Sequence, residues 1–241
     1  MLIQVRRRQL LAAALIGATF AALGITLASS HAATTGGSPA ELLTSAKTLA
    51  PLTASVTYRA SSFPLPLRFT APDSSWLGAQ FKAASHGRPV FGWVVVGHPP
   101  LAKPRGLIAI ETAFGPTHSV AATIANLRYG GSSLPETHLG GVQFGTPTRT
   151  KLAGYPGQQF DGQVWGKFGH TFLPFSPHLR GPASPPDSNH LQRGEAFRFI
   201  ALNVNGKTVV LGLESLGLPA DQFPAFLTSA RRLLQSLVLS A

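Results

Sequence analysis

The histidines are the residues best suited to chemistry in this 241-residue chain, because imidazole transfers protons near neutral pH and binds metals. Of the eight, all but one lie past residue 33: His86, His98, His118, His138, His170, His178 and His190. None shows the H-x-H or H-E-x-x-H spacing that brings two imidazoles to one metal ion. The last three lie on or beside an irregular stretch, residues 166–195, where convergence on a metal is possible but independent surface histidines are favoured. We therefore predict no metal site and no cofactor.

No motif of nucleophilic catalysis is present. The segment from Gly212 to Gly217 has its serine one residue away from the place required by G-x-S-x-G, which indicates that Ser215 is an ordinary turn residue. The acidic residues stand far apart in sequence, so paired catalytic carboxylates are not indicated. We predict no catalytic residue. A hydrolase is the weakest alternative, since it needs a serine or carboxylate that meets a histidine at hydrogen-bonding distance only in three dimensions.

Five residues are candidates for ligand binding. Tyr155 and Asp161 belong to a glycine-rich segment, and Trp165, Phe172 and Phe175 place aromatic side chains around residues 166–195. Irregular stretches of that length are uncommon in a compact domain, and the aromatic side chains would suit the wall of a pocket for a small molecule or lipid. The structural alternatives, which we favour, are a simple turn and a set of aromatic residues that hold the stretch against a sheet.

Residues 1–33 predict export. In order, they contain the arginines Arg7 and Arg8, the leucines Leu10 and Leu11, an apolar run to Ala28, and the small residues Ser30 and Ala32. Basic, apolar and small residues in this order are typical of a bacterial export signal, and the arginine pair before two leucines is typical of the twin-arginine type. We expect cleavage after Ala32 or Ala33. The alternatives are a general secretory signal and an uncleaved anchor, because about 20 apolar residues span a bilayer.

The composition narrows the possible partners. The chain has 20 Lys and Arg against nine Asp and Glu, a formal net charge of +11. Beyond the N-terminal arginines the bases are spread out, so we expect no nucleic-acid partner. A basic surface suits an anionic polymer or lipid headgroup of the cell envelope as the partner. A protein of the envelope is an equally open alternative. The absence of cysteine excludes disulfides, thiolate metal sites and covalent haem.

Residues 34–57 are predicted to form a flexible tether, and residues 58–241 a single domain of ordinary size. The strongest structural signal is the Asn205-Gly206 pair, which predicts a hairpin between residues 197–204 and 207–214. A two-residue turn sets Leu202 opposite Val209 and Ile200 opposite Leu211, so one face of the hairpin is aliphatic and needs a cover.

Two helices are expected to pack on this sheet. An apolar stripe from Phe223 to Leu237 predicts the larger one, with Asp221 as its N-cap, and a shorter helix is expected from Thr117 to Arg128. The predicted fold class is therefore α+β, a mostly antiparallel twisted sheet with helices packed on it.

The order of these segments resembles the PsbP-like family, as found in exported actinobacterial-type proteins of unknown function. The resemblance covers about residues 58–239 and rests on Phe69 to Trp76, the shorter helix, Gly154 to Gly162, the hairpin and the last helix. It implies an αβα sandwich that serves as a non-enzymatic accessory or binding module. We therefore expect an exported, non-catalytic module that contacts an envelope protein, an anionic polymer or a lipid. A small-molecule or lipid carrier with a pocket near residues 166–195 is the alternative.

The intact mass of the protein recovered from its host's envelope fraction tests the export prediction. We expect a chain that begins near Ala33, because the small residues there suit a signal-peptide cleavage site. A mass that still includes Met1 or Leu2 would mean that the apolar segment is retained as a membrane anchor.

Overall fold

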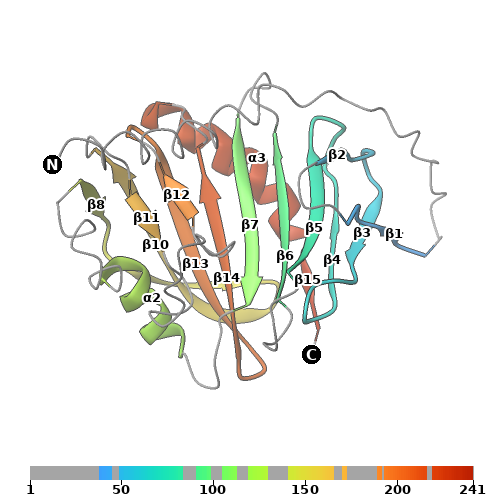
Figure 1. Cartoon of the computed structure of the whole chain (residues 1–241), viewed down its shortest axis with the longest axis horizontal. Helices are drawn as coiled ribbons and strands as arrows, with labels where there is room; N and C mark the ends of the chain where they lie inside the picture. Colours follow the sequence, from blue (N-terminus) through green and yellow to red (C-terminus); the bar gives the residue numbers. More distant parts are fainter. Residues whose placement is uncertain are drawn as a thin grey trace, which may run out of the picture. The chain divides into compact units, whose positions relative to one another are not determined.

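In a computed structural model of the chain, the largest unit among the described residues is a nine-stranded antiparallel sheet (Figure 1). The structure describes residues 38–44, 49–83, 91–98, 105–112, 119–129, 141–165, 170–172, 189–191, 193–215 and 219–240. The strands pair in the order β2-β5-β6-β7-β14-β13-β10-β8, and β9 also pairs with β10. Their bounds are β2 (Ala50–Pro51), β5 (Leu77–Ala83), β6 (Phe91–His98), β7 (Gly106–Thr112), β14 (Lys207–Glu214), β13 (Ala196–Val204), β10 (Tyr155–Val164), β8 (Val142–Phe144) and β9 (Thr148–Leu152).

Two smaller sheets and three helical segments complete the described fold. A four-stranded sheet has the order β1 (Ala40–Glu41), β3 (Thr57–Ala60), β4 (Leu67–Thr70) and β15 (Val238–Leu239), and β11 (His170–Phe172) pairs with β12 (Asn189–Leu191). The helical segments are α2 (Val120–Tyr129), the 3₁₀ turn η3 (Ala220–Gln222) and α3 (Phe223–Gln235). Within the part of the chain that the structure describes, no helix combines the length and the hydropathy needed to cross a bilayer.

The predicted hairpin is confirmed. β13 and β14 pair with Leu202 opposite Val209 and Ile200 opposite Leu211. Asn205 and Gly206 take φ values of 49° and 85°, the left-handed conformations that a two-residue hairpin turn requires. The side chain of Asn203 accepts a hydrogen bond from the Gly206 N–H (2.8 Å). The turn therefore fixes which residues of both strands face each side of the sheet.

One face of the large sheet is aliphatic and is covered by α3. Cross-strand pairing aligns buried residues of four neighbouring strands in one row, Val94, Ile110, Leu211 and Ile200. Phe226 of α3 is fully buried in the same core, a burial worth about 1.5–3 kcal/mol. Gly106 lets the helix approach, because a Cβ there would lie 2.3 Å from the Phe226 ring. Figure 1 shows α3 passing behind β7.

The opposite face carries a second core built on aromatic residues. Phe160, Phe197 and Phe199 are buried with ring centroids 5.4 to 6.2 Å apart. Ile124 and Leu127 of α2 pack in this cluster. The described start of α2 is capped by Ser119, whose hydroxyl accepts the N–H of Ala122 (3.1 Å). The predicted starting residue, Thr117, lies outside the described residues.

The predicted α+β class, a PsbP-like αβα sandwich with helices packed on the sheet, is wrong. The described residues are mostly β-strand, and the α-helices among them number two, with 10 and 13 residues. The prediction gave the two apolar stripes too much weight. Several strands, such as the two-residue β1 and β2 and the polar β9, are too short or too polar to show a period-2 pattern, so only their partners reveal them.

The described part of the predicted tether is also folded, contrary to expectation. β1 pairs with β3 and β2 pairs with β5, while Leu42 and Leu52 are 1% and 3% exposed. The buried amide of Gln80 donates to the Leu42 carbonyl oxygen (2.7 Å), 38 residues away along the chain. Contacts between residues so far apart in sequence leave no local pattern. The composition of residues 34–57 alone therefore suggested a linker. The predicted export signal, residues 1–33, lies outside the described residues and remains a prediction.

The last helix forms, but its predicted cap is wrong. Asp221 lies within η3, and the residue at the N-cap is Gln222, which makes no side-chain capping hydrogen bond. The C-terminal end is tied to β4, because the hydroxyl of Ser236 accepts the N–H of Thr70 (2.9 Å). This bond joins residues 166 positions apart and helps to hold α3 on the aliphatic face.

Glu41→Gln should destabilise the N-terminal segment. Partial burial raises the pKa of Glu41, but hydrogen bonds from Ser61, Gln80 and Arg59 outweigh it and lower that pKa from 4.5 to about 2. The charged form therefore stabilises the fold above pH 4.5, and this contribution is lost as the pH falls toward 2. Because the Arg59–Glu41 pair is solvent-screened, we expect a loss of about 1 kcal/mol at pH 7 by chemical denaturation. A difference that stays constant down to pH 2 would contradict this account.

Candidate functional site: buried carboxyls and exposed cations

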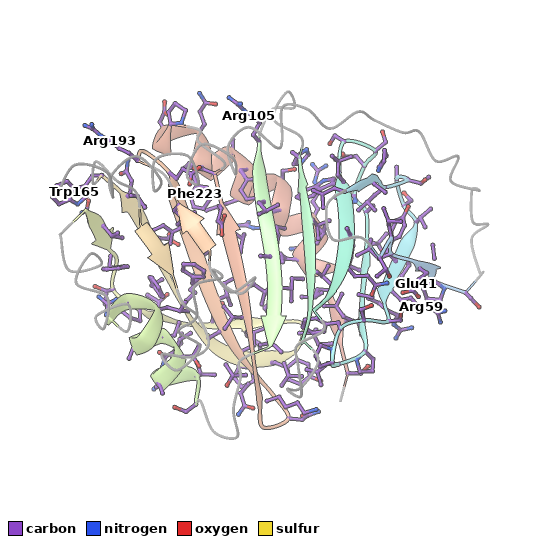
Figure 2. The ribbon with its side chains drawn as sticks, viewed as in Figure 1. Glu41, Arg59, Arg105, Trp165, Arg193 and Phe223 are labelled. Atoms are coloured by element: carbon purple, nitrogen blue, oxygen red, sulfur yellow. The ribbon has the colours of Figure 1, made fainter. Side chains whose placement is uncertain are left out.

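Buried polar groups gather at one end of the large sheet. Cross-strand pairing aligns a row of residues there, Gly97, Leu107, Glu214, Phe197 and Gly162. His98 lies one position further out on β6, and the N–H of Ser215 binds the Ala196 carbonyl oxygen at the end of the hairpin (3.0 Å). Figure 2 shows Arg105 and Arg193, which precede β7 and β13, along the same edge. We call this region the polar end.

Two glutamates are buried at the polar end. Glu214 is 7% exposed and Glu195 is 6% exposed. The residues opposite Glu214 on the neighbouring strands, Phe197 and Leu107, are apolar. Burial and the charge of Glu195 raise the pKa of Glu214 to about 8, and Oε1 of Glu214 has no hydrogen-bond partner among the described residues. At pH 7 Glu214 therefore keeps a proton that an ordinary glutamate has lost.

The sequence did not predict this pair, because the two residues are distant along the chain. The signal was nevertheless available in the hairpin register. Phe197 lies opposite Glu214, so Glu195, two residues before Phe197, falls diagonally across from Glu214 on the same face of the strand pair. Ser215, predicted to be an ordinary turn residue, is fully buried, and its hydroxyl accepts the N–H of Ala196 (3.0 Å).

A serine–histidine contact lies at the polar end on the α3 side. His98 is 4% exposed, and its Nε2 lies 3.1 Å from Oγ of Ser229 on α3. The imidazole packs on Trp76 with ring centroids 4.1 Å apart. Burial lowers the pKa of His98, although Asp73 and the backbone of Ser75 act in the opposite direction. The imidazole is therefore mostly neutral at pH 7.

A serine and a histidine at hydrogen-bonding distance are what a hydrolase would need, but the surrounding geometry does not support catalysis. Ser229 lies inside α3, where backbone N–H groups bind carbonyl oxygens along the helix and cannot stabilise an oxyanion. Asp73 would be the third triad residue, but its carboxylate accepts hydrogen bonds from the N–H and hydroxyl of Ser75. We therefore assign the His98–Ser229 contact to the anchoring of α3 on β6.

The described residues among the five ligand-binding candidates do not form one site. Tyr155 begins β10 and Trp165 follows its last residue, so the two lie far apart, and the Tyr155 hydroxyl donates to the Leu239 carbonyl oxygen (3.0 Å). Asp161 binds the guanidinium of Arg198 through both oxygens (2.6 and 2.7 Å). Trp165 is 60% exposed and points outward in Figure 2. Phe175 and the side chain of Phe172 lie outside what the structure describes.

On the described surface, unpaired cations outnumber unpaired carboxylates, which are Asp73 and Asp221. Glu41 and Asp161 are used in ion pairs with arginines, and Glu195 and Glu214 are buried. The exposed cations that form no salt bridge with a described carboxylate are Arg68, Arg149, Lys151, Arg193, Lys207, Arg231 and Arg232.

Two of these cations alternate on an edge strand. Arg149 and Lys151 lie on β9, opposite Gln158 and Pro156 of β10, so they face the same side of the strand. Alternate residues of a strand lie about 6.8 Å apart. Within the described sheet β9 pairs with β10 alone, and we call its free side the basic edge. Charged side chains on such an edge also discourage pairing with another strand.

No protein-family model, curated protein or solved structure matches this chain. The resemblance to the PsbP-like family therefore remains a prediction, although the fold that it implied is wrong. Across the described ranges, no group of three or more His, Asp and Glu side chains is placed to hold a metal ion.

Glu214→Gln should stabilise the protein at neutral pH. The folded state keeps its proton up to a pKa of about 8, whereas the unfolded chain loses it near 4.5. The stability of the unmodified protein should therefore fall as the pH rises between these values. The glutamine variant removes this penalty, and we expect a gain of up to about 3 kcal/mol at pH 7.

Chemical denaturation at pH 5, 6, 7 and 8 measures this effect. The unmodified protein should lose stability across the series, while Glu214→Gln should give a flatter profile. Parallel profiles would show that the Glu214 carboxyl titrates normally.

Proposed function

We propose that this protein is an exported, non-catalytic binding module that contacts an anionic polymer of the cell envelope through the basic edge. The observation that carries the proposal is the alternation of Arg149 and Lys151 along an exposed edge strand. Export rests on the order of basic, apolar and small residues in positions 1–33.

The charge distribution supports an anionic partner. Of the described carboxylates, Glu41 and Asp161 are ion-paired and Glu195 and Glu214 are buried, so Asp73 and Asp221 are the ones left to compete for the exposed cations. A polymer with repeating phosphate or carboxylate groups carries the complementary negative charge. When the protein's cations neutralise these groups, counterions bound to the polymer are released. We therefore expect the affinity to fall steeply with salt.

The backbone of β9 supports the proposal as well. Five residue pairs join it to β10, from Tyr155 opposite Leu152 to Gln159 opposite Thr148. The strand therefore holds its two cations at a set spacing before any partner arrives. Little conformational entropy is lost in ordering that backbone on binding, which favours affinity.

The alternative functions have weaker support. A carrier with a pocket near residues 166–195 would need the predicted aromatic wall, of which the described side chain, Trp165, points outward. A hydrolase would need Ser229 to act as a nucleophile from within a helix. Neither arrangement explains why Arg149 and Lys151 stand together on an edge.

Replacement of both Arg149 and Lys151 by Glu tests the proposal. We expect binding to long-chain polyphosphate, measured by isothermal titration at 50 mM salt, to weaken at least about tenfold. The slope of log affinity against log salt concentration should become shallower by about two, because two contacts that release counterions are lost. Binding to anionic lipid vesicles is measured in parallel. Preferential binding to the vesicles would identify a lipid surface, rather than a polymer, as the partner.

The matched control is the double replacement of Arg231 and Arg232 by Glu. It changes the net charge equally, and both residues are exposed on α3. The control should lose much less affinity than the β9 variant. Equal losses would show that total charge rather than the basic edge drives binding, and an undetectable affinity of the unmodified protein would overturn the proposal.

A further inference from the structure

The contact between α3 and the end of β6 is built on a buried histidine. His98 is 4% exposed, its Nε2 lies 3.1 Å from Oγ of Ser229, and its ring packs on Trp76 with centroids 4.1 Å apart. Trp76 in turn packs on Phe226 of α3, with ring centroids 6.4 Å apart. The imidazole therefore joins the sheet to the middle of the helix that covers its aliphatic face.

This position suits a neutral imidazole better than a charged one. The neutral ring has one donor and one acceptor nitrogen, whereas the imidazolium has two N–H donors. Ser229 offers an acceptor at Nε2, but Nδ1 of His98 has no hydrogen-bond partner among the described residues. A buried charge with an unsatisfied donor is costly. Protonation of His98 therefore opposes the closed contact.

Two neighbouring groups reduce this cost without cancelling it. The carboxylate of Asp73 and the backbone of Ser75 favour the imidazolium, but burial outweighs them and lowers the pKa of His98 below its ordinary value of 6.5. Asp73 already accepts hydrogen bonds from the N–H and hydroxyl of Ser75, and Arg232 of α3 attracts the same carboxylate. The negative charge beside His98 is therefore shared with other groups.

The other charged groups at the polar end lie on the opposite face of the sheet. Gly97, the residue before His98, is in register with Leu107 and through it with Glu214. Since side chains alternate along a strand, the two buried glutamates face away from the imidazole. Arg105 precedes Gly106, the cross-strand partner of His98, and the same alternation directs it away as well.

We propose that His98 is a pH switch for α3, which is held on the sheet at neutral pH and loosens when the medium becomes acidic. The neutral imidazole stabilises the closed form above pH 6.5, and this contribution is lost as the pH falls below that value, because the opened form takes up a proton more readily. Loosening uncovers aliphatic residues such as Val94 and Ile110, so acidification changes the surface that the protein presents. This inference is independent of the basic edge.

Amide hydrogen exchange of the full chain, measured by mass spectrometry at pH 7.5 and pH 5, tests the proposal. The rates are corrected for the intrinsic effect of pH and expressed as protection factors. In the unmodified protein, the protection of α3 should fall about fivefold or more at pH 5, while that of β13 and β14 changes less than about twofold, because opening is local.

Three variants separate the switch from a general loss of stability. His98→Gln keeps a hydrogen-bonding side chain that does not titrate, so its α3 protection should not fall at pH 5. The matched control Ser236→Ala removes the bond between α3 and Thr70, and it should lower α3 protection at both pH values and keep the pH-dependent fall. Asp73→Asn removes the carboxylate that favours the imidazolium and should enlarge that fall.

The absence of a fall in unmodified α3, an equal fall in His98→Gln, or an equal fall in β13 and β14 would overturn the proposal. The ¹⁵N chemical shifts of the His98 imidazole give a readout that needs no variant. We expect them to titrate with a midpoint below pH 6.5, and a midpoint at or above 6.5 would contradict the switch. Unchanged polyphosphate binding by His98→Gln at pH 7.5 would separate these outcomes from a failure of the proposed function.

Discussion

The hydrogen-bonded register of the β13–β14 hairpin is the constraint on which the rest of the fold depends. Asn205 and Gly206 set it through their positive φ values, and the strands on either side, β7 and β10, continue it outward. Because side chains alternate along a strand, this one turn sends Ile200 and Leu211 to the α3 side and Phe199 to the other. A shift of the register by one residue would move the residues of each core to the opposite face of the sheet. A register shifted in this way would therefore disrupt both cores.

The same alternation places an acid where apolar residues would be more stable. Glu214 continues the side that begins with Val210 and Gly212, and it meets Phe197 and Leu107 across the sheet. Its neighbour Glu195 belongs to the same end of the hairpin. Raising the pKa of Glu214 to about 8 is the electrostatic consequence of burial beside a like charge. Glu214 therefore carries a stability cost at neutral pH that an apolar residue at this position would not carry.

The sequence predicted the features that are set locally. The Asn205-Gly206 turn and the apolar stripe that begins at Phe223 each specify an element within about fifteen residues, and both elements formed. The strands β1, β2 and β9 could not be predicted, since they depend on partners such as Gln80 and β10 that are remote in sequence. The same reason applies to the site. Glu195 and Glu214 became neighbours only through the register, whereas Tyr155 and Asp161, chosen from a local motif, turned out to have structural partners.

The titration of Glu214 measures the central claim most directly. The ¹³C chemical shift of its side-chain carboxyl, assigned with the Glu214→Gln variant, reports the protonation state of this one group against pH. We expect a midpoint near pH 8. A midpoint near the ordinary value of 4.5 would contradict this, because it would mean that Glu214 is neither desolvated nor opposed by Glu195.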